Sequence, residues 1–213
     1  MPILNPIEMN IPNEQFLVER LSNIKLYQNL FTKAFPKATS PISFTNIKTA
    51  IGAFERTLVT PSRFDEFVQG NNNALTNKEK QGLALFVKTG CTSCHNGKLL
   101  GASSYQKFGV TANYWDYTNS KKRDKGRFAV TGNQGDSYVF KVPSLRNVNE
   151  TYPYFHDGSV EKLSDAVWIM ARVQLDKDLS EEDVDLIVKF LETTTGSLQV
   201  DKQTPTPKLA QNI

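Results

Sequence analysis

The chain has 213 residues, of which 39% are hydrophobic and 22% are charged, and its net charge is +3. This apolar content excludes an intrinsically disordered protein, and so small a net charge implies no nucleic-acid or anionic-membrane partner. The longest apolar runs, such as residues 83–87, fall far short of the roughly 20 residues that cross a bilayer. We therefore expect a globular protein with no membrane span.

Helical patterns occupy the first third of the chain. Residues 14–35 carry apolar side chains at helical spacing, which predicts two short helices that end before Pro36. The same spacing over residues 45–60 predicts another helix, and Pro61 marks its end.

A sharper helix signal lies in the middle of the chain, before a long irregular stretch. Thr76 and Glu79 are spaced as a capping box, and the helix that they open should stop at Gly90. Residues 96–149 show neither a helical nor a strand period and predict a long insert. Loops of that length usually wrap a ligand or are mobile.

Regular spacing returns near the C-terminus. Apolar residues at i, i+4 and i+7 between residues 163 and 170 predict a helix, and Ser180 is expected to cap a last helix that runs to Gly196. Residues 198–213 have little to bury and are expected to form an extended tail. The pattern as a whole predicts an all-α fold with long irregular loops.

The cysteines and histidines are few and clustered. The chain contains Cys91, Cys94, His95 and His156, and no other residue of either type. Two cysteines three apart cannot form the disulfide framework of a fold, and they supply too few ligands for a closed zinc site. Residues 91–95 instead fit c-type haem attachment, in which two thiols add to the porphyrin vinyl groups and the adjacent histidine ligates the iron.

Two other interpretations of residues 91–95 are a redox Cys-x-x-Cys with an accidental histidine and a partial metal site. A thioredoxin-like motif should follow a strand and begin a helix, whereas this one follows the end of a predicted helix. The setting therefore favours one covalent haem c.

The second axial ligand decides between ligand binding and electron transfer. The candidates are His156, Met170, Met1 and Met9. A thioether raises the reduction potential and suits an electron acceptor, but Met170 fits the apolar core of its helix equally well. His156 lies in the aromatic turn 152–158, where a histidine bonded to a carbonyl or a haem propionate is expected. The residues alone leave this choice open.

Five stretches of the chain, in the same order, resemble the C-terminal portion of the bacterial di-haem cytochrome c peroxidases. They are residues 2–9, 50–58, 91–97, 142–148 and 152–158. The resemblance implies a cytochrome c-like haem domain over residues 63–197, with a tail over 198–213. It also implies that residues 1–62 are the closing helices of a second, truncated cytochrome c-like domain.

The resemblance implies that Met170 is the second axial ligand. The high-potential haem of the family is held by the histidine of its second Cys-x-x-Cys-His motif and by a methionine at this offset after the His-Asp-Gly turn. Related enzymes that oxidise protein-bound tryptophan place a tyrosine there, so a methionine argues against that activity. A buried porphyrin would also account for the supply of aromatic side chains, each of which is a candidate for the pocket wall or an ordinary core residue: Phe86, Phe108, Tyr154, Phe155 and Trp168.

Family members reduce hydrogen peroxide to water with electrons from a small redox protein, a cytochrome c or a cupredoxin. The resemblance assigns acid/base catalysis to Glu8, within an Asn-Pro-x-Glu-Met motif, although on its own it would be a solvated surface carboxylate. Calcium lies between the domains in the family, and the backbone carbonyls of Thr151 and Pro153 match two of its ligands. A homodimer is one assembly open to such a chain.

The family carries two Cys-x-x-Cys-His motifs and this sequence has one. We therefore expect a fragment, a split-gene product or one piece of a larger assembly, which passes electrons and needs the missing N-terminal haem domain for peroxidase turnover. The alternative is a stand-alone mono-haem electron carrier without peroxidase activity.

The first residues lack the basic start, apolar stretch and cleavage site of a secretory signal, which taken literally indicates the cytoplasm. Haem c chemistry belongs to an oxidising compartment outside the cytoplasmic membrane. We therefore expect a periplasmic protein whose sequence is that of a mature or truncated chain.

Overall fold

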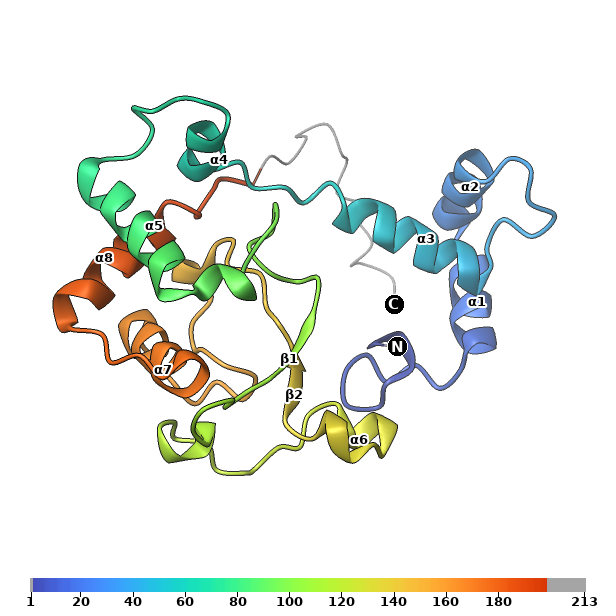
Figure 1. The fold of residues 1–213 in the computed structure, drawn as a ribbon. Helices are drawn as coiled ribbons and strands as arrows, with labels where there is room; N and C mark the ends of the chain where they lie inside the picture. The colour runs from blue at the N-terminus through green and yellow to red at the C-terminus, as the bar shows by residue number, and fades with distance from the viewer. Residues whose placement is uncertain (1, 199–213) are drawn as a thin grey trace. The chain divides into compact units, whose positions relative to one another are not determined.

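The computed structural model describes residues 2–198, which form two compact units, residues 2–59 and 60–198 (Figure 1). The domain boundary expected after residue 62 falls close to this division. The tail expected over residues 198–213 lies outside the described residues from 199 onward.

The first unit is helical. It contains η1 (Pro2–Leu4), α1 (Glu14–Ser22), α2 (Lys25–Ala34) and α3 (Phe44–Glu55). The two helices predicted within residues 14–35 are confirmed as α1 and α2. Helix α3 ends before the expected position near Thr60, because the amides of Thr57 and Leu58 bond three residues back and tighten the chain into a turn.

The helices of the first unit bury only a small core. Ile3, Phe44 and Ile47 are its buried apolar side chains. Several large apolar side chains of this unit are instead exposed: Ile7, Met9, Phe16, Leu26, Leu30, Ile51, Phe54, Leu58 and Val59. An apolar surface of this extent is typical of an interaction surface.

The second unit carries more helices and a small sheet. Its elements are α4 (Arg63–Val68), α5 (Asn77–Thr89), η2 (Cys91–Ser93), β1 (Tyr105–Lys107), η3 (Tyr114–Asp116), α6 (Phe128–Thr131), η4 (Gln134–Asp136), β2 (Val139–Lys141), η5 (Val148–Glu150), α7 (Leu163–Leu175) and α8 (Glu181–Glu192).

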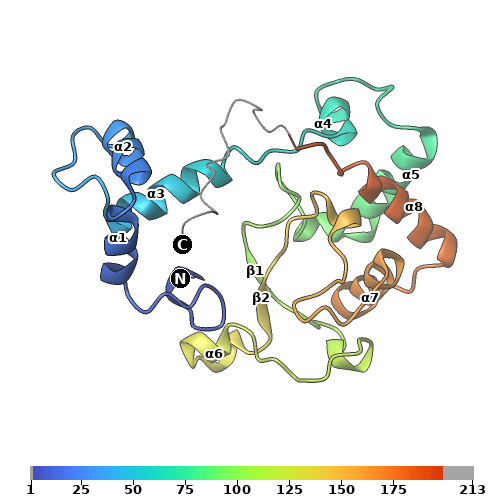
Figure 2. The same cartoon turned by 180° about the vertical axis from the view of Figure 1, so that it is seen from behind.

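Helices α5 and α8 lie side by side in both views (Figure 1 and Figure 2). Gly82 of α5 permits this contact, since a Cβ there would overlap the backbone carbonyl of Leu186 on α8. The ring of Phe190 on α8 lies 5.2 Å from that of Phe86 and 5.4 Å from that of Phe64, measured between centroids. These rings form the centre of the core of the second unit.

Side-chain caps mark the start of α4, α5 and α8. The capping box predicted at Thr76 and Glu79 is confirmed, and so is the cap of α8 at Ser180, which accepts from the Asp183 amide. A second capping box at Ser62 opens α4. The sequence pattern did not predict α4, because six residues are too few to show a helical period.

The predicted irregular stretch contains a small two-stranded antiparallel sheet, and the fold as a whole is mostly helical. Strands β1 and β2 pair with Tyr105 opposite Lys141 and Lys107 opposite Val139. Three residues in each strand give too little alternation to be recognised from sequence. Within residues 2–198, no helix combines the length and the apolar character needed to cross a membrane.

Candidate haem site

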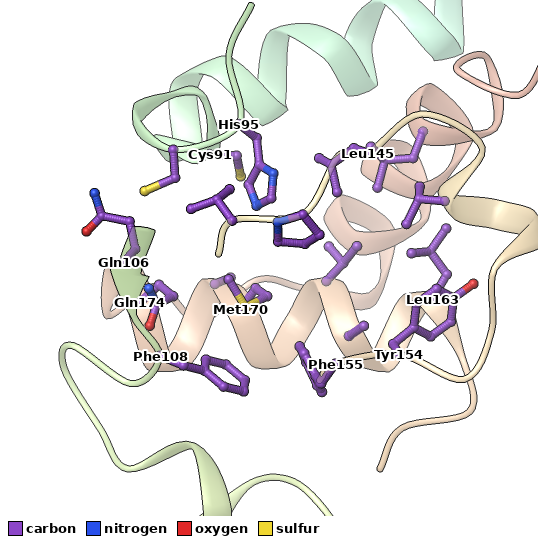
Figure 3. A pocket seen from close by; sticks show the side chains of 18 of the residues that line it. Cys91, His95, Gln106, Phe108, Leu145, Tyr154, Phe155, Leu163, Met170 and Gln174 are labelled. Carbon is purple, nitrogen blue, oxygen red and sulfur yellow. The ribbon is translucent and has the colours of Figure 1, made fainter. Parts of the chain in front are cut away.

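The second unit encloses a cavity of about 390 Å³, whose walls are mainly apolar (Figure 3). This volume lies within the usual range of ligand pockets, roughly 300–1,000 Å³. The walls come from the end of α5, the two strands, residues 142–156, and helices α7 and α8. Segments far apart in the sequence therefore enclose one apolar space.

Helix α7 lines one side of the cavity along a single face. The lining residues recur at helical spacing: Leu163, Ala166, Val167, Met170, Ala171, Gln174 and Leu175. Ile169 and Val173, on another face of the same helix, are buried in the core. One helix thus contributes both to the core and to the cavity.

Cys91 and Cys94 lie in the turn that follows α5, and both side chains line the cavity as half-buried free thiols. The turn is held by the amides of Cys94 and His95, which both donate to the Cys91 carbonyl. Burial raises the pKa of the Cys91 thiol to about 11. The free thiol is therefore protonated at neutral pH.

His95 is oriented by a backbone carbonyl. Its Nδ1 lies 3.1 Å from the Leu100 oxygen, which can only accept, so Nδ1 carries the proton and donates. Burial lowers the pKa of the imidazole, although the backbone carbonyls of Leu100 and Pro143 act in the opposite direction. In the neutral ring Nε2 carries no proton, so its lone pair can bind a metal.

Gly101 makes room for this arrangement. A Cβ at this position would lie 3.0 Å from the Pro143 carbonyl carbon, closer still to its oxygen, and 3.3 Å from Nδ1 of His95. The backbone φ of Gly101 is also +130°, which side chains rarely adopt. A larger residue would therefore displace the loop that supports the imidazole.

Met170 projects from α7 toward the cavity, and His95 projects into it from the opposite wall (Figure 3). The structure thus brings Cys91, Cys94, His95 and Met170 together around one cavity. Thiols, an imidazole and a thioether are the donor set that holds haem c. The residues present fit that group.

His156 also lines the cavity, but its ring is packed among aromatic side chains. The imidazole stacks on Phe140 at a centroid distance of 4.1 Å and meets Tyr114 edge-on at 5.5 Å. This packing favours a wall residue over an axial ligand.

Four of the five predicted wall aromatics line the cavity: Phe86, Phe108, Tyr154 and Phe155. The prediction for Trp168 is wrong. Trp168 is 36% exposed and lies 6.1 Å from the ring of Tyr117, outside the cavity. Two residues before Met170, it lies roughly 200° around the helix and so faces the other way.

Two polar residues that the sequence patterns did not single out join distant segments of the second unit. Gln174 accepts hydrogen bonds from the amides of Gly109 and Val110 at 2.5 and 3.3 Å and donates to the Lys107 carbonyl at 3.0 Å. These bonds attach the end of β1 to the helix that carries Met170. No local pattern marks this residue, since its partners are more than 60 positions away.

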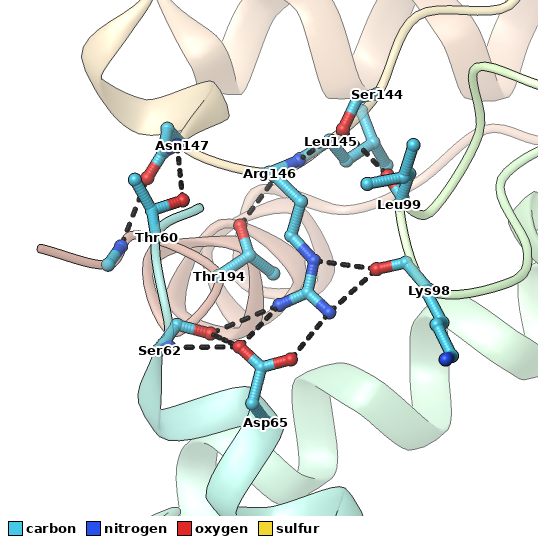
Figure 4. Close-up of polar contacts among 11 residues, drawn as sticks. Thr60, Ser62, Asp65, Lys98, Leu99, Ser144, Leu145, Arg146, Asn147 and Thr194 are labelled. Atoms are coloured by element: carbon cyan, nitrogen blue, oxygen red, sulfur yellow. Dashed lines mark hydrogen bonds and ion pairs between the residues drawn. The ribbon is translucent and has the colours of Figure 1, made fainter. Parts of the chain in front are cut away.

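The second residue is Arg146, whose guanidinium binds Asp65 at 2.8 and 2.9 Å and the Lys98 carbonyl at 2.7 and 2.9 Å (Figure 4). Burial acts to raise the pKa of Asp65, but hydrogen bonds from Ser62 and Arg146 outweigh it and hold the pKa below its ordinary value. Arg146 lies in one of the stretches that carry the family resemblance, which assigned it no role.

Glu8 and the predicted calcium ligands are not part of the donor set. Glu8 is an exposed turn residue of the first unit and does not line this cavity. Thr151 and Pro153 do line it. The described residues contain no group of three or more His, Cys, Asp or Glu side chains that could hold a metal ion. The roles of Glu8, Thr151 and Pro153 stay predictions.

Comparison with known proteins decides the family. A sequence model described as di-haem cytochrome c peroxidase matches residues 1–73. The cytochrome c551 peroxidase of Pseudomonas aeruginosa is 47% identical over 196 residues, 92% of this chain and 56% of the relative. That of Nitrosomonas europaea is 45% identical over 197 residues, 92% of this chain and 57% of the relative.

This chain belongs to the di-haem cytochrome c peroxidase family. The resemblance seen in the sequence is thereby confirmed. The chain spans about half the length of these curated relatives.

Solved structures show a fold similar to that of this family member. A MauG-like protein associated with microbial copper homeostasis superposes with a TM-score of 0.71 at 29% identity, covering 91% of this chain and 67% of that chain. The diheme peroxidase BthA of Burkholderia thailandensis superposes with a TM-score of 0.66 at 19% identity, covering 92% of this chain and 62% of that chain. At that identity the second similarity concerns the fold alone.

Proposed function

We propose that residues 60–198 form the electron-transfer haem domain of a cytochrome c peroxidase, which reduces hydrogen peroxide to water with electrons from a small redox protein. One observation carries the proposal: two thiols, one imidazole and one thioether line a single apolar cavity. The family membership of the chain supports the same reaction.

In this proposal Cys91 and Cys94 would attach haem c through two thioether bonds, and His95 and Met170 would hold its iron. When bound, haem c supplies an iron that stores one electron in its ferrous state. The Met170 thioether favours that state and so raises the reduction potential. The apolar walls exclude water, and the Leu100 carbonyl keeps Nε2 of His95 directed at the cavity.

Residues 2–59 belong, in this proposal, to a domain that binds peroxide on a second haem and is completed by an N-terminal segment. The exposed apolar side chains of α2 and α3 support this assignment, since they would be covered by that segment. Glu8 would there take a proton from peroxide and return it to the departing oxygen. Calcium would bind the backbone carbonyls of Thr151 and Pro153, which suit a hard cation.

The proposed partners are a cytochrome c or cupredoxin that donates electrons, the N-terminal haem domain and, in a homodimer, a second copy of the chain. The proposed compartment is the periplasm, where haem c proteins of this family act.

The presence of a single Cys-x-x-Cys-His motif favours a second candidate function for this chain, a mono-haem electron carrier without catalysis. The two candidates differ in what happens when an N-terminal haem domain is supplied. The carrier would gain no peroxidase activity from it.

The ligand assignment is tested on the haem-loaded chain. We expect a low-spin ferric spectrum with the weak near-infrared charge-transfer band of methionine ligation, and we expect Met170→Ala to abolish that band. Met9→Ala is the matched control, because Met9 is an exposed methionine of the first unit. A band that survives in Met170→Ala would overturn the assignment.

The division of labour is tested with peroxide. The chain alone should consume hydrogen peroxide negligibly, and addition of the N-terminal haem domain of a close relative should give turnover that depends on a reduced cytochrome c. Rapid turnover by the chain alone would refute the division. Absence of turnover after addition of the domain would favour the carrier.

A further inference from the structure

We infer that Arg146 and Asp65 are positioning residues for His95, acting through the backbone carbonyls of residues 98–100. The inference rests on the proposed function, because it concerns the strength with which His95 holds the haem iron. Neither residue lines the cavity, so neither touches the haem.

The guanidinium of Arg146 uses all its donors. Nε and Nη2 donate to the Lys98 carbonyl at 2.9 and 2.7 Å, and Nη1 donates to the Ser62 hydroxyl at 3.1 Å. Nη1 and Nη2 also form a bidentate ion pair with the Asp65 carboxylate at 2.9 and 2.8 Å (Figure 4). Lysine cannot reproduce this planar fork, because its ammonium is a point donor.

The Asp65 carboxylate that anchors this network has further hydrogen bonds and is partly withdrawn from water. Asp65 is also the acceptor of the capping box of α4, where it binds the amide and the hydroxyl of Ser62 at 2.8 and 2.7 Å. The side chain of Arg146 is 15% exposed and that of Asp65 is 29% exposed. Charge-assisted bonds are stronger and less screened at such sites than at the open surface.

Residues 144–146 hold three successive carbonyls of the loop that follows the haem motif. Arg146 donates to the Lys98 carbonyl, and the Ser144 hydroxyl donates to the Leu99 carbonyl at 2.7 Å. The Leu145 amide is shared, since it lies 3.3 Å from both the Leu99 and the Leu100 oxygen. The Arg146 amide in turn donates to the Ser144 hydroxyl at 3.1 Å.

The third of these carbonyls accepts the Nδ1 proton of His95. A well-aligned acceptor at Nδ1 raises the basicity of Nε2, so it strengthens the bond to ferric iron and shields the Nδ1 proton from solvent. If the Lys98 carbonyl is held less firmly, the Leu100 carbonyl two residues later should become more mobile, and its hydrogen bond from Nδ1 of His95 should weaken. The haem would become easier to reduce.

The test uses the full haem-loaded chain and the variant Arg146→Lys. The matched control is Arg63→Lys, because Arg63 forms the same forked pair with Glu79, at 3.0 and 2.6 Å, and Glu79 likewise closes a capping box. No hydrogen bond connects Arg63 with residues 98–100 in the described part of the chain.

Two measurements separate positioning from general stability. The solvent exchange of the His95 Nδ1 proton is followed by NMR in the ferrous state, and the reduction potential is measured by titration. We expect Arg146→Lys to accelerate this exchange at least tenfold and to raise the potential by about 59 mV, which is a tenfold change in the one-electron equilibrium. Arg63→Lys should change neither quantity, even where it lowers the melting temperature.

A second variant, Ser144→Ala, removes the hydroxyl bond to the Leu99 carbonyl, which then keeps only the longer bond from the Leu145 amide at 3.3 Å, and should change both quantities in the same direction. If Arg146→Lys does not bind haem, Ser144→Ala alone tests the positioning role. Wild-type values in both variants, or equal changes in Arg63→Lys, would overturn the positioning role while the His95 and Met170 ligation stands. A wild-type chain without a histidine-ligated low-spin haem would overturn the proposed function as well.

Discussion

The contact between α5 and α8 offers a quantitative test of how the haem site is supported. Helix α5 leads directly into the turn with Cys91, and α8 contributes Ile187 and Leu191 to the cavity wall. At Gly82 a methyl group would lie 2.7 Å from the carbonyl carbon of Leu186 and closer still to its oxygen. Gly82→Ala should therefore push the two helices apart.

The expected cost follows from that geometry. The obstructing atoms are backbone and cannot rotate away, so the helices must separate by roughly 1.5 Å to restore ordinary contact with the Leu186 oxygen. Overpacking of this kind costs about 3 kcal/mol, and the gain in helix propensity from glycine to alanine returns about 1 kcal/mol. The net loss of about 2 kcal/mol should lower the melting temperature of a unit of this size by about 4–8 °C.

The assay is thermal unfolding of the haem-loaded chain followed at the haem absorbance band, which reports the second unit. Gly135→Ala is the control, since a Cβ there would meet only the Asn133 amide oxygen, at 3.4 Å. We expect little change in the control. If Gly82→Ala melts at the wild-type temperature or above it, the backbone contact between α5 and α8 does not limit the packing as argued.

Three further predictions concern polar groups of the second unit. Hydrogen bonds from Arg63 hold the pKa of Glu79 at about 2 instead of 4.5, so the ionised carboxylate stabilises the fold above pH 4.5 and this stabilisation is lost as the pH falls through about 2. Glu79→Gln should thus lower the free energy of unfolding by about 1–2 kcal/mol near pH 7, a value that allows for solvent screening at the half-exposed Arg63. In urea unfolding, the difference between the variant and the wild type should disappear in acid. Gln174→Ala should lower the free energy of unfolding by about 1–3 kcal/mol and accelerate hydrogen exchange at the amides of Gly109 and Val110. Unchanged exchange at these two amides would refute the bridging role of Gln174. In the haem-free chain, burial raises the pKa of Cys91 to about 11, so its alkylation rate should keep rising above pH 9.0, and a plateau at 9.0 would contradict that burial.

Local signals allowed much of the helical structure to be predicted. The capping box at Thr76, the apolar spacing in residues 14–35 and the cap at Ser180 each depend on residues within one or two turns of one another. The haem motif is equally local, because both thiols and the imidazole lie within residues 91–95.

Elements that are short or that depend on distant partners could not be predicted. Helix α4 and the strands β1 and β2 have too few residues to show a period, and their stability comes from contacts with other segments. The error at Trp168 was avoidable, because helical geometry already places Trp168 on the opposite face to Met170.

The sequence by itself determined the family and predicted the haem attachment motif, since both depend on short, ordered stretches of residues. The tertiary structure alone decided how that site is assembled. It brought Met170 to the cavity opposite His95, and it joined Arg146 to Asp65 across 81 positions. Such pairings arise because folding buries apolar surface and encloses polar groups, which then bind to partners on segments distant in the sequence. No local pattern encodes which segments those are.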